Sequence, residues 1–222
     1  MLSVSKDFNG PFKALKTAIQ QRDMAFKVLF GVVHGLVHDH SHIETFQTQA
    51  LHGITQVTYQ NARTKSYKNA RSIAFLLYHM TRIEDICASV LIAETEEVFF
   101  KDGWADVFNF SKVDTGNAWT DHEIDLFTQS VRLNDLLAYR KSVCNQTRSI
   151  VEHMSLEDLN RSVSATQIQK LVLTKSIDTH EDAIWLLDYW GKKTKGELLL
   201  MPLSRHAVVH FNDIIKMKKY NK

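Results

Sequence analysis

The chain has 222 residues, long enough for one domain with a substantial hydrophobic core, and we expect a single domain over residues 1–222. Apolar residues make up 44% and charged residues 23%, which excludes an intrinsically disordered chain. The formal net charge is only +2, so the composition gives no support for a dedicated nucleic-acid binder. With 8 Gly and 2 Pro there are few residues for the tight turns of a sheet protein, and long helices are favoured.

The cysteines and the N-terminal segment indicate a reducing compartment. Cys87 and Cys144 form neither a disulfide framework nor a CxxC pair, and we interpret both as structural thiols. The segment MLSVSKDFNGPF lacks the apolar stretch of a signal peptide, and no apolar run approaches the ~20 residues that span a bilayer. We therefore expect a cytoplasmic protein without a membrane partner.

Apolar residues at helical spacing predict the first long helix over residues 11–38, with Pro11 at its start. Residues 40–66 show weak periodicity and are predicted to form a long connection with one short helix. A second long helix is predicted over residues 68–94, and its apolar stripe includes His79. Residues 98–119 are aromatic but irregular, which indicates an ordered loop.

The second half of the chain predicts further helices. Thr120 and Glu123 form a capping box for a third long helix that should end near residue 153. Short helical segments are predicted after Ser155 and over residues 165–173. Residues 180–218 should form one kinked helix or two, with the break at Met201-Pro202. The predicted fold is all-α: an antiparallel four-helix bundle with long decorated connections, in which the second and last long helices pack together.

Histidines at HxxxH spacing are the strongest functional signal. Two imidazoles four residues apart on a helix project from one face and are able to meet at one metal ion. The C-terminal pair, His206 and His210, shares its face with Asp213, and His79 becomes a third ligand if its apolar stripe packs against that helix. The alternative is that these are core histidines hydrogen-bonded to the backbone or to acidic neighbours. Three histidine ligands would leave one coordination position for water or substrate.

Four more histidines, His34, His38, His40 and His42, cluster in the last part of the first predicted helix and just beyond it. His34 and His38 flank the apolar face of this helix. His38, His40 and His42 lie where it should end, and we interpret them as a solvated, polar helix end, because a cation is favourable near a helix C-terminus. A second, surface metal site is the alternative, and the role of the cluster stays open at this point.

The charged residues after His79 and the standard catalytic motifs add no further candidate site. Arg82, Glu84 and Asp85 follow His79 but are predicted to point away from its face, and Arg82 and Asp85 are predicted to pair with each other or to tie the helix to a neighbour. The chain has no P-loop, no GxGxxG and no HExxH.

The sequence resembles the DinB-like superfamily of bacterial metal-binding four-helix bundles. The resemblance spans most of the chain and is carried by the segments KALKTAIQQRDMAFKVLF, LLYHMTRIEDICASVLIA, VDTGNAWT, LLDYWGKKT and LLLMPLSRHAVVHFND. It implies that His79, His206 and His210 bind a divalent metal ion, zinc or nickel. Many members carry glutamine where this chain has Asp213, whose carboxylate is a candidate fourth ligand, a catalytic base or a group that orients bound water.

The resemblance implies metal-dependent chemistry without fixing the reaction, since some relatives are thiol transferases that use mycothiol or bacillithiol and others resemble hydrolases or isomerases. We expect a metal-dependent hydrolase or thiol S-transferase in which the three-histidine site activates water or a thiol. The substrate would be a small molecule, with a low-molecular-weight thiol as one option. Its pocket would be walled by Trp104, Trp185 or Tyr189, unless these aromatic residues belong to the core.

The alternative function is a non-catalytic metal-binding protein of the stress or DNA-damage response. A closed site filled by Asp213 would support a structural metal. The local support for an association with DNA is limited to the basic tail KMKKYNK, and a nucleic-acid partner is not expected. The sequence leaves the oligomeric state open, with a homodimer among the options.

Overall fold

The computed structural model describes residues 1–38, 44–64 and 70–220, and this part of the chain is helical with no β-sheet. The prediction of an all-α protein is confirmed. The α-helices, in chain order, are α1 (Asn9–Gln21), α2 (Phe26–Val37), α3 (Phe46–Leu51), α4 (Gln56–Asn61), α5 (Ile73–Asp85), α6 (Val98–Lys101), α7 (Trp104–Phe108), α8 (Asp121–Ser130), α9 (Leu133–His153), α10 (Ala165–Leu173), α11 (Glu181–Gly191), α12 (Lys195–Leu200) and α13 (His206–Tyr220).

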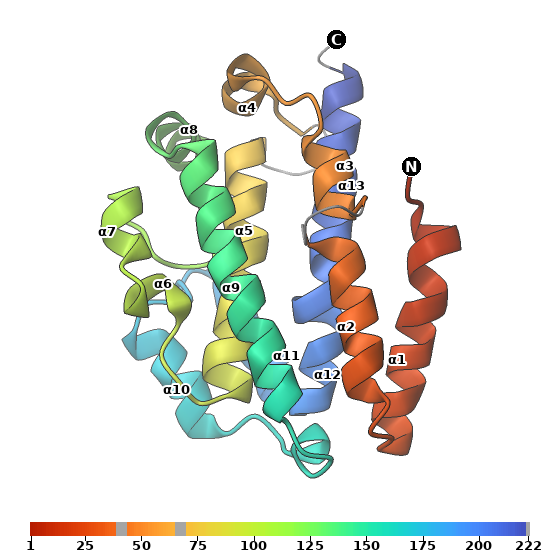
Figure 1. Cartoon of the computed structure of the whole chain (residues 1–222). Helices are drawn as coiled ribbons and strands as arrows, with labels where there is room; N and C mark the ends of the chain where they lie inside the picture. The colour runs from red at the N-terminus through yellow and green to blue at the C-terminus, as the bar shows by residue number, and fades with distance from the viewer. Residues whose placement is uncertain (39–43, 65–69, 221–222) are drawn as a thin grey trace.

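The long helices lie side by side along one axis (Figure 1). Helix α5 packs against both α9 and α13, as predicted for the second and last long helices, and α2 packs against α9. The colour gradient in Figure 1 shows that α2 and α13 run in one direction and α5 and α9 in the other. The neighbours α5 and α9 are therefore parallel, and the packing is not antiparallel throughout. The connection over residues 93–132 is long enough to return the chain to the end where α5 began.

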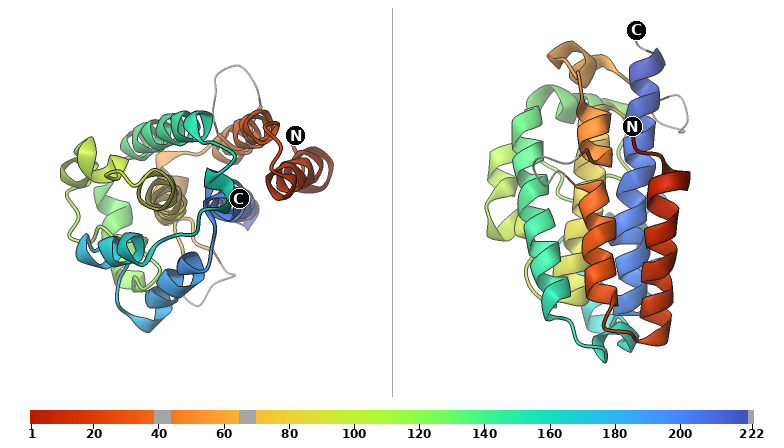
Figure 2. Two further views of the ribbon diagram at one scale, coloured as in Figure 1. Left: turned by 90° about the horizontal axis from the view of Figure 1, so that it is seen from below. Right: turned by 45° about the vertical axis from the view of Figure 1, so that its right-hand side comes forward.

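Seen from the end and from the side, α1 lies outside the other long helices, against α2, while α6 and α7 cover the opposite side (Figure 2). Buried apolar side chains form one contiguous core that extends from Phe8 in the first turn to Met217 in α13. Among the described helices, none is both long enough and apolar enough to cross a bilayer.

The predicted first helix over residues 11–38 is wrong as a single helix. The chain reverses between α1 and α2, where Arg22 adopts a left-handed conformation with φ of 54° and Asp23 accepts a hydrogen bond from the backbone of Ala25. The apolar residues on either side of the break, Ile19 and Phe26, are seven apart, so the stripe alone does not reveal the reversal.

The third and last predicted helices are also interrupted at positions other than those expected. The capping box of Thr120 and Glu123 is confirmed, but the predicted third helix is divided into α8 and α9 by an extended residue, Val131. Before α13, the break falls at residues 192–194, where Thr194 caps α12, and not at Met201-Pro202. Pro202 lies in a π-helical turn, Met201–Arg205, that joins α12 to α13 without a gap, because a wider turn accommodates the missing N–H.

Helix α5 starts after Ser72, whose hydroxyl accepts a hydrogen bond from the backbone of Phe75, and continues as a π-helical turn over Ile86–Ile92. The connection predicted over residues 40–66 holds two short helices, α3 and α4, where one was expected. His40 and His42, from the predicted helix end, lie outside the described residues.

Candidate metal centre

His79 on α5 meets His206 and His210 on α13 in the interior between these helices. The ring centroids lie 5.0 Å apart for His79 and His206, 5.2 Å for His79 and His210, and 4.6 Å for His206 and His210. One nitrogen from each ring lies within 4.8 Å of the other two. Two nitrogens bound to one tetrahedral ion at 2.0–2.1 Å are about 3.4 Å apart, so small side-chain rotations would close this cluster around an ion. The three predicted ligands are thus brought together.

A backbone carbonyl holds the ring of His79. Its Nδ1 lies 2.7 Å from the carbonyl oxygen of Thr115, to which it donates a hydrogen bond, and the ring stacks on Phe75 with centroids 5.6 Å apart. The donated proton fixes the tautomer, so Nε2 of His79 carries the lone pair. Metal-binding histidines commonly donate their second N–H to a carbonyl in this way.

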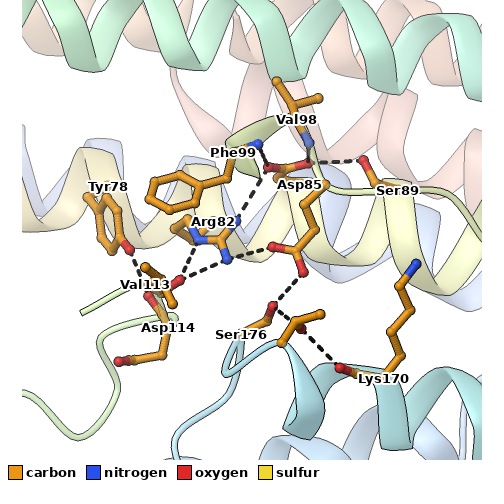
Figure 3. A network of polar contacts seen from close by, with 12 residues as sticks. Tyr78, Arg82, Asp85, Ser89, Val98, Phe99, Val113, Asp114, Lys170 and Ser176 are labelled. Carbon is orange, nitrogen blue, oxygen red and sulfur yellow. Dashed lines mark hydrogen bonds and ion pairs between the residues drawn. The ribbon is translucent and has the colours of Figure 1, made fainter. Parts of the chain in front are cut away.

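Thr115 belongs to a loop over residues 113–115, and all three backbone carbonyls of this loop accept hydrogen bonds from side chains of α5. Arg82 donates to the carbonyl of Val113 from Nε at 3.0 Å and from Nη2 at 2.8 Å, and Tyr78 donates to the carbonyl of Asp114 at 3.0 Å. His79 donates to the third carbonyl, that of Thr115. Figure 3 shows the first two of these contacts within a wider polar network. The loop that orients His79 is therefore attached to the helix that carries His79.

Arg82, which binds the carbonyl of Val113, belongs to a network of buried charges. Arg82 lies 2.6 Å from Glu97 and 3.4 Å from Asp85, which confirms its predicted pairing with Asp85 (Figure 3). Burial alone would lower the pKa of Arg82, but Glu97 and the other nearby acidic groups hold that pKa well above its ordinary value, so the guanidinium is charged. Asp85 in turn accepts hydrogen bonds from the backbone N–H groups of Val98 and Phe99.

The α13 pair approaches from one helical face. Nε2 of His206 lies 3.1 Å from Nε2 of His210, and Nδ1 of His210 lies 3.4 Å from a carboxylate oxygen of Asp213. The other oxygen of Asp213 lies 3.6 Å from Lys216. Asp213 therefore faces the far nitrogen of His210, as an orienting carboxylate does, and is not among the residues whose ligand atoms converge.

Two of the three imidazoles, those of His79 and His206, are neutral at neutral pH. Burial, reinforced by His210, lowers the pKa of His79 to about 3. Burial and the neighbouring His210 and His79 also hold the pKa of His206 well below its ordinary value. Neutral imidazole is the form that binds metal, so protons compete weakly with an ion here.

A second cluster, which we call the His34 cluster, consists of His34 on α2, His38 directly after the end of α2, Glu84 on α5 and Cys144 on α9. Nε2 of His34 lies 3.0 Å and Nε2 of His38 3.2 Å from the two carboxylate oxygens of Glu84. Nδ1 of His34 lies 4.0 Å from the sulfur of Cys144. The interpretation of His38 as part of a solvated helix end is wrong, because its side chain is buried, and His34, predicted to flank the apolar face of the helix, is fully buried as well.

Charges within the His34 cluster oppose the effects of burial. Burial alone would raise the pKa of Glu84, but His38 and His34 hold it well below its ordinary value, so Glu84 is ionised. Burial lowers the pKa of His38, although the nearby Glu84 carboxylate acts to raise it.

Both cysteines are buried. Burial raises the pKa of Cys144 to about 12 and that of Cys87 well above its ordinary value, so both are neutral thiols. This excludes a free thiolate nucleophile at neutral pH.

The aromatic residues proposed as pocket walls lie in other contacts. Trp104 packs against Phe108 and Tyr139, and Trp185 and Tyr189 contact each other on α11 with 50% and 37% of their surfaces exposed. An aromatic ring that does contact the cluster is Phe75, which stacks on His79 and carries the guanidinium of Arg71 4.4 Å from its ring centroid.

The sequence did not predict the roles of three residues in the two histidine clusters. The carbonyl of Thr115 has no sequence signal, because any residue supplies a carbonyl. Glu84 is predicted to face away from His79, and in the structure that direction leads to the histidine of α2, His34, and not to solvent. Cys144 was interpreted as a structural thiol; its partner His34 comes from 110 residues earlier in the chain, and no local pattern links them.

Comparison with protein-family models gave no match, and neither did comparison with curated proteins. A crystal structure of a conserved protein from Enterococcus faecalis is similar in fold, with a TM-score of 0.55. The alignment covers 99% of this chain and 96% of that chain at 14% sequence identity. This likeness shows a shared fold over nearly the whole chain.

Proposed function

We propose that this chain is a metal-dependent enzyme in which His79, His206 and His210 bind one divalent ion, zinc or nickel. The observation that carries the proposal is the convergence of three imidazoles from two helices, one of them fixed by the carbonyl of Thr115. Imidazole nitrogens suit both metals. We further propose that α2, α5, α9 and α13 are the four helices of a DinB-like bundle, which the sequence resemblance and the packing of these helices support.

The chemistry of the proposed centre follows from its three protein ligands. An ion held by three imidazoles keeps a position for water or a thiol and lowers the pKa of the group bound there. His79 keeps its lone pair on Nε2 because Thr115 accepts the other proton, and a carboxylate oxygen of Asp213 lies 3.4 Å from Nδ1 of His210. Arg71 adds positive charge near His79, which favours an anionic substrate or a thiolate. Metal-dependent hydrolysis and metal-dependent thiol transfer both use such a site.

A non-catalytic metal protein is the second candidate, and the position of Asp213 distinguishes the two. A closed site would need a fourth protein ligand, and Asp213 faces the far side of His210 instead. The DNA-associated alternative has less support. In the basic tail, Lys218 donates to the carbonyls of Gln49, Ala50 and His52 at the end of α3, and Lys216 faces Asp213.

The proposal is tested by the metal content of protein purified without a histidine tag. Alanine at His79, His206 or His210 should each remove one equivalent of bound metal. His122→Ala and His153→Ala are matched controls, because both histidines are exposed on other helices, and they should leave the metal content unchanged. Full retention of metal in all three site variants would contradict the proposal.

Activity is then tested on the metal-loaded protein. Ester or amide hydrolysis and thiol conjugation to an electrophile are assayed with wild type and with His206→Ala. Turnover that requires both added metal and His206 supports the enzyme. Tight metal binding without turnover of either substrate class, together with a closed coordination sphere, would favour the non-catalytic candidate.

A further inference from the structure

The His34 cluster has the composition of a metal site as well as of a hydrogen-bond network. Its four side chains come from α5, α9 and the C-terminal end of α2 and are fully or almost fully buried. One nitrogen from each histidine and the sulfur of Cys144 lie within 4.8 Å of one another. The rings of His34 and His38 stack with centroids 3.9 Å apart, so the two imidazoles have similar orientations. Histidine and cysteine are the ligands that zinc prefers.

The carboxylate of Glu84 decides which nitrogen of His34 faces an ion. Its two oxygens lie 3.0 Å from Nε2 of His34 and 3.2 Å from Nε2 of His38, and the first of these contacts is a hydrogen bond. An ionised carboxylate accepts hydrogen bonds, so Nε2 of His34 carries the proton and its Nδ1 carries the lone pair. Nδ1 of His34 does face the sulfur of Cys144, at 4.0 Å. Glu84 therefore orients the ring of His34 in the way that the Thr115 carbonyl orients the ring of His79.

We infer that His34, His38 and Cys144 form a second binding site for a zinc-type divalent ion, with Nδ1 of His34, one ring nitrogen of His38 and Sγ of Cys144 as ligands and Glu84 as the carboxylate that orients the ring of His34. Binding displaces the thiol proton of Cys144 to solvent, one proton for each ion bound. The thiolate and Glu84 then offset the two positive charges of the ion. This site does not depend on the three-histidine centre.

The site has access to the surface. A pocket of about 330 Å³ is lined by His38 and Cys144 together with Gln47, Arg140 and Lys141. Arg140 is buried and donates to Gln47 at 2.7 Å, and within the described part of the chain its Nη2 has no hydrogen-bond partner. An ion held by three protein ligands would direct its fourth position to this pocket, where Arg140 favours a small anion such as a carboxylate.

Cobalt(II) is the probe that separates the two sites, because only a thiolate ligand gives sulfur-to-cobalt charge-transfer absorption in the near ultraviolet. Reduced, metal-free protein without a tag is titrated with cobalt under anaerobic conditions. We expect two equivalents to bind, one of them with this absorption and with release of one proton. Wild-type protein saturated with cobalt but lacking the absorption would overturn the inference.

The chain has only two cysteines, which makes Cys87→Ser the decisive variant. Both thiols are buried, and absorption that persists in Cys87→Ser comes from Cys144 alone. Cys144→Ser should lose the absorption. The double variant His206→Ala/His210→Ala should lose one equivalent of cobalt but keep the absorption, which separates failure of the three-histidine site from failure of this one. Absorption that disappears in a folded Cys87→Ser variant contradicts the assignment.

Discussion

Asp213 shows how a residue outside the ligand set acts on the proposed centre. Its carboxylate lies 3.4 Å from Nδ1 of His210, so it favours the tautomer whose Nε2 faces the other histidines. Asp213→Ala should weaken zinc binding about 10- to 100-fold, as measured by competition with a fluorescent chelator. Asp188→Ala is the matched control, because that carboxylate is exposed and pairs with Lys192. Equal zinc affinity in both variants would mean that Asp213 does not orient His210.

The buried histidines predict an acid-sensitive protein. The pKa values of His38, His79 and His206 are depressed by burial, so the unfolded chain binds protons near pH 6 that the folded chain does not. Each such group removes stability as the pH falls below its unfolded pKa of about 6.5, by about 1.4 kcal/mol per pH unit at most. Glu84, whose pKa is also depressed, contributes only at lower pH.

Urea unfolding of metal-free protein between pH 7.5 and pH 5.5 measures this effect. We expect the free energy of unfolding to fall steeply on acidification. His79→Leu should flatten the slope, because the replacement binds no proton in either state. A free energy that is constant across this range would show that the histidines titrate normally in the folded protein.

At the scale of elements, α5 and the loop over residues 113–115 act as one unit. The hydroxyl of Tyr78 donates to Asp114 at 3.0 Å, next to the carbonyl that holds His79. Tyr78→Phe should cost about 1–3 kcal/mol of stability and should also weaken zinc binding, because the carbonyl of Thr115 becomes less fixed.

Tyr59→Phe is the control for this effect. Tyr59 is also buried, and its hydroxyl donates to a backbone carbonyl, that of Val131, at 2.8 Å, away from the histidines. Both variants should lose similar stability in urea unfolding, whereas only Tyr78→Phe should lose zinc affinity. Equal affinities would separate the loop from the metal centre.

Sequence patterns predicted helices better than the connections between them. Side-chain periodicity places His79 on the buried face of α5 and the pair His206 and His210 on one face of α13, and the packing of these helices brings them together. The break near Arg22 is invisible to periodicity, because the apolar stripe stays in phase across it. The contacts of Glu84 depend on which helix packs behind α5, and that is decided by the whole fold.

At the scale of the molecule, one contiguous core holds the helices together, and most of it is apolar. Removal of metal should therefore lower the melting temperature without unfolding the chain. At a free zinc concentration of 100 times Kd, a single site stabilises the folded state by about 2.7 kcal/mol. Calorimetry with and without chelator should show a shift of about 5–10 °C for a chain of this size. Unfolding on chelation at 25 °C would contradict an independent core.

The position of a bound ion tests the central claim most directly. A crystal of the tag-free protein soaked in zinc is measured at the zinc absorption edge, and the anomalous difference map locates the ion. The account predicts a peak about 2.0–2.2 Å from one nitrogen each of His79, His206 and His210, with the Thr115 carbonyl still bonded to His79. A map with no peak among these three imidazoles, in a crystal that binds zinc elsewhere, would contradict it.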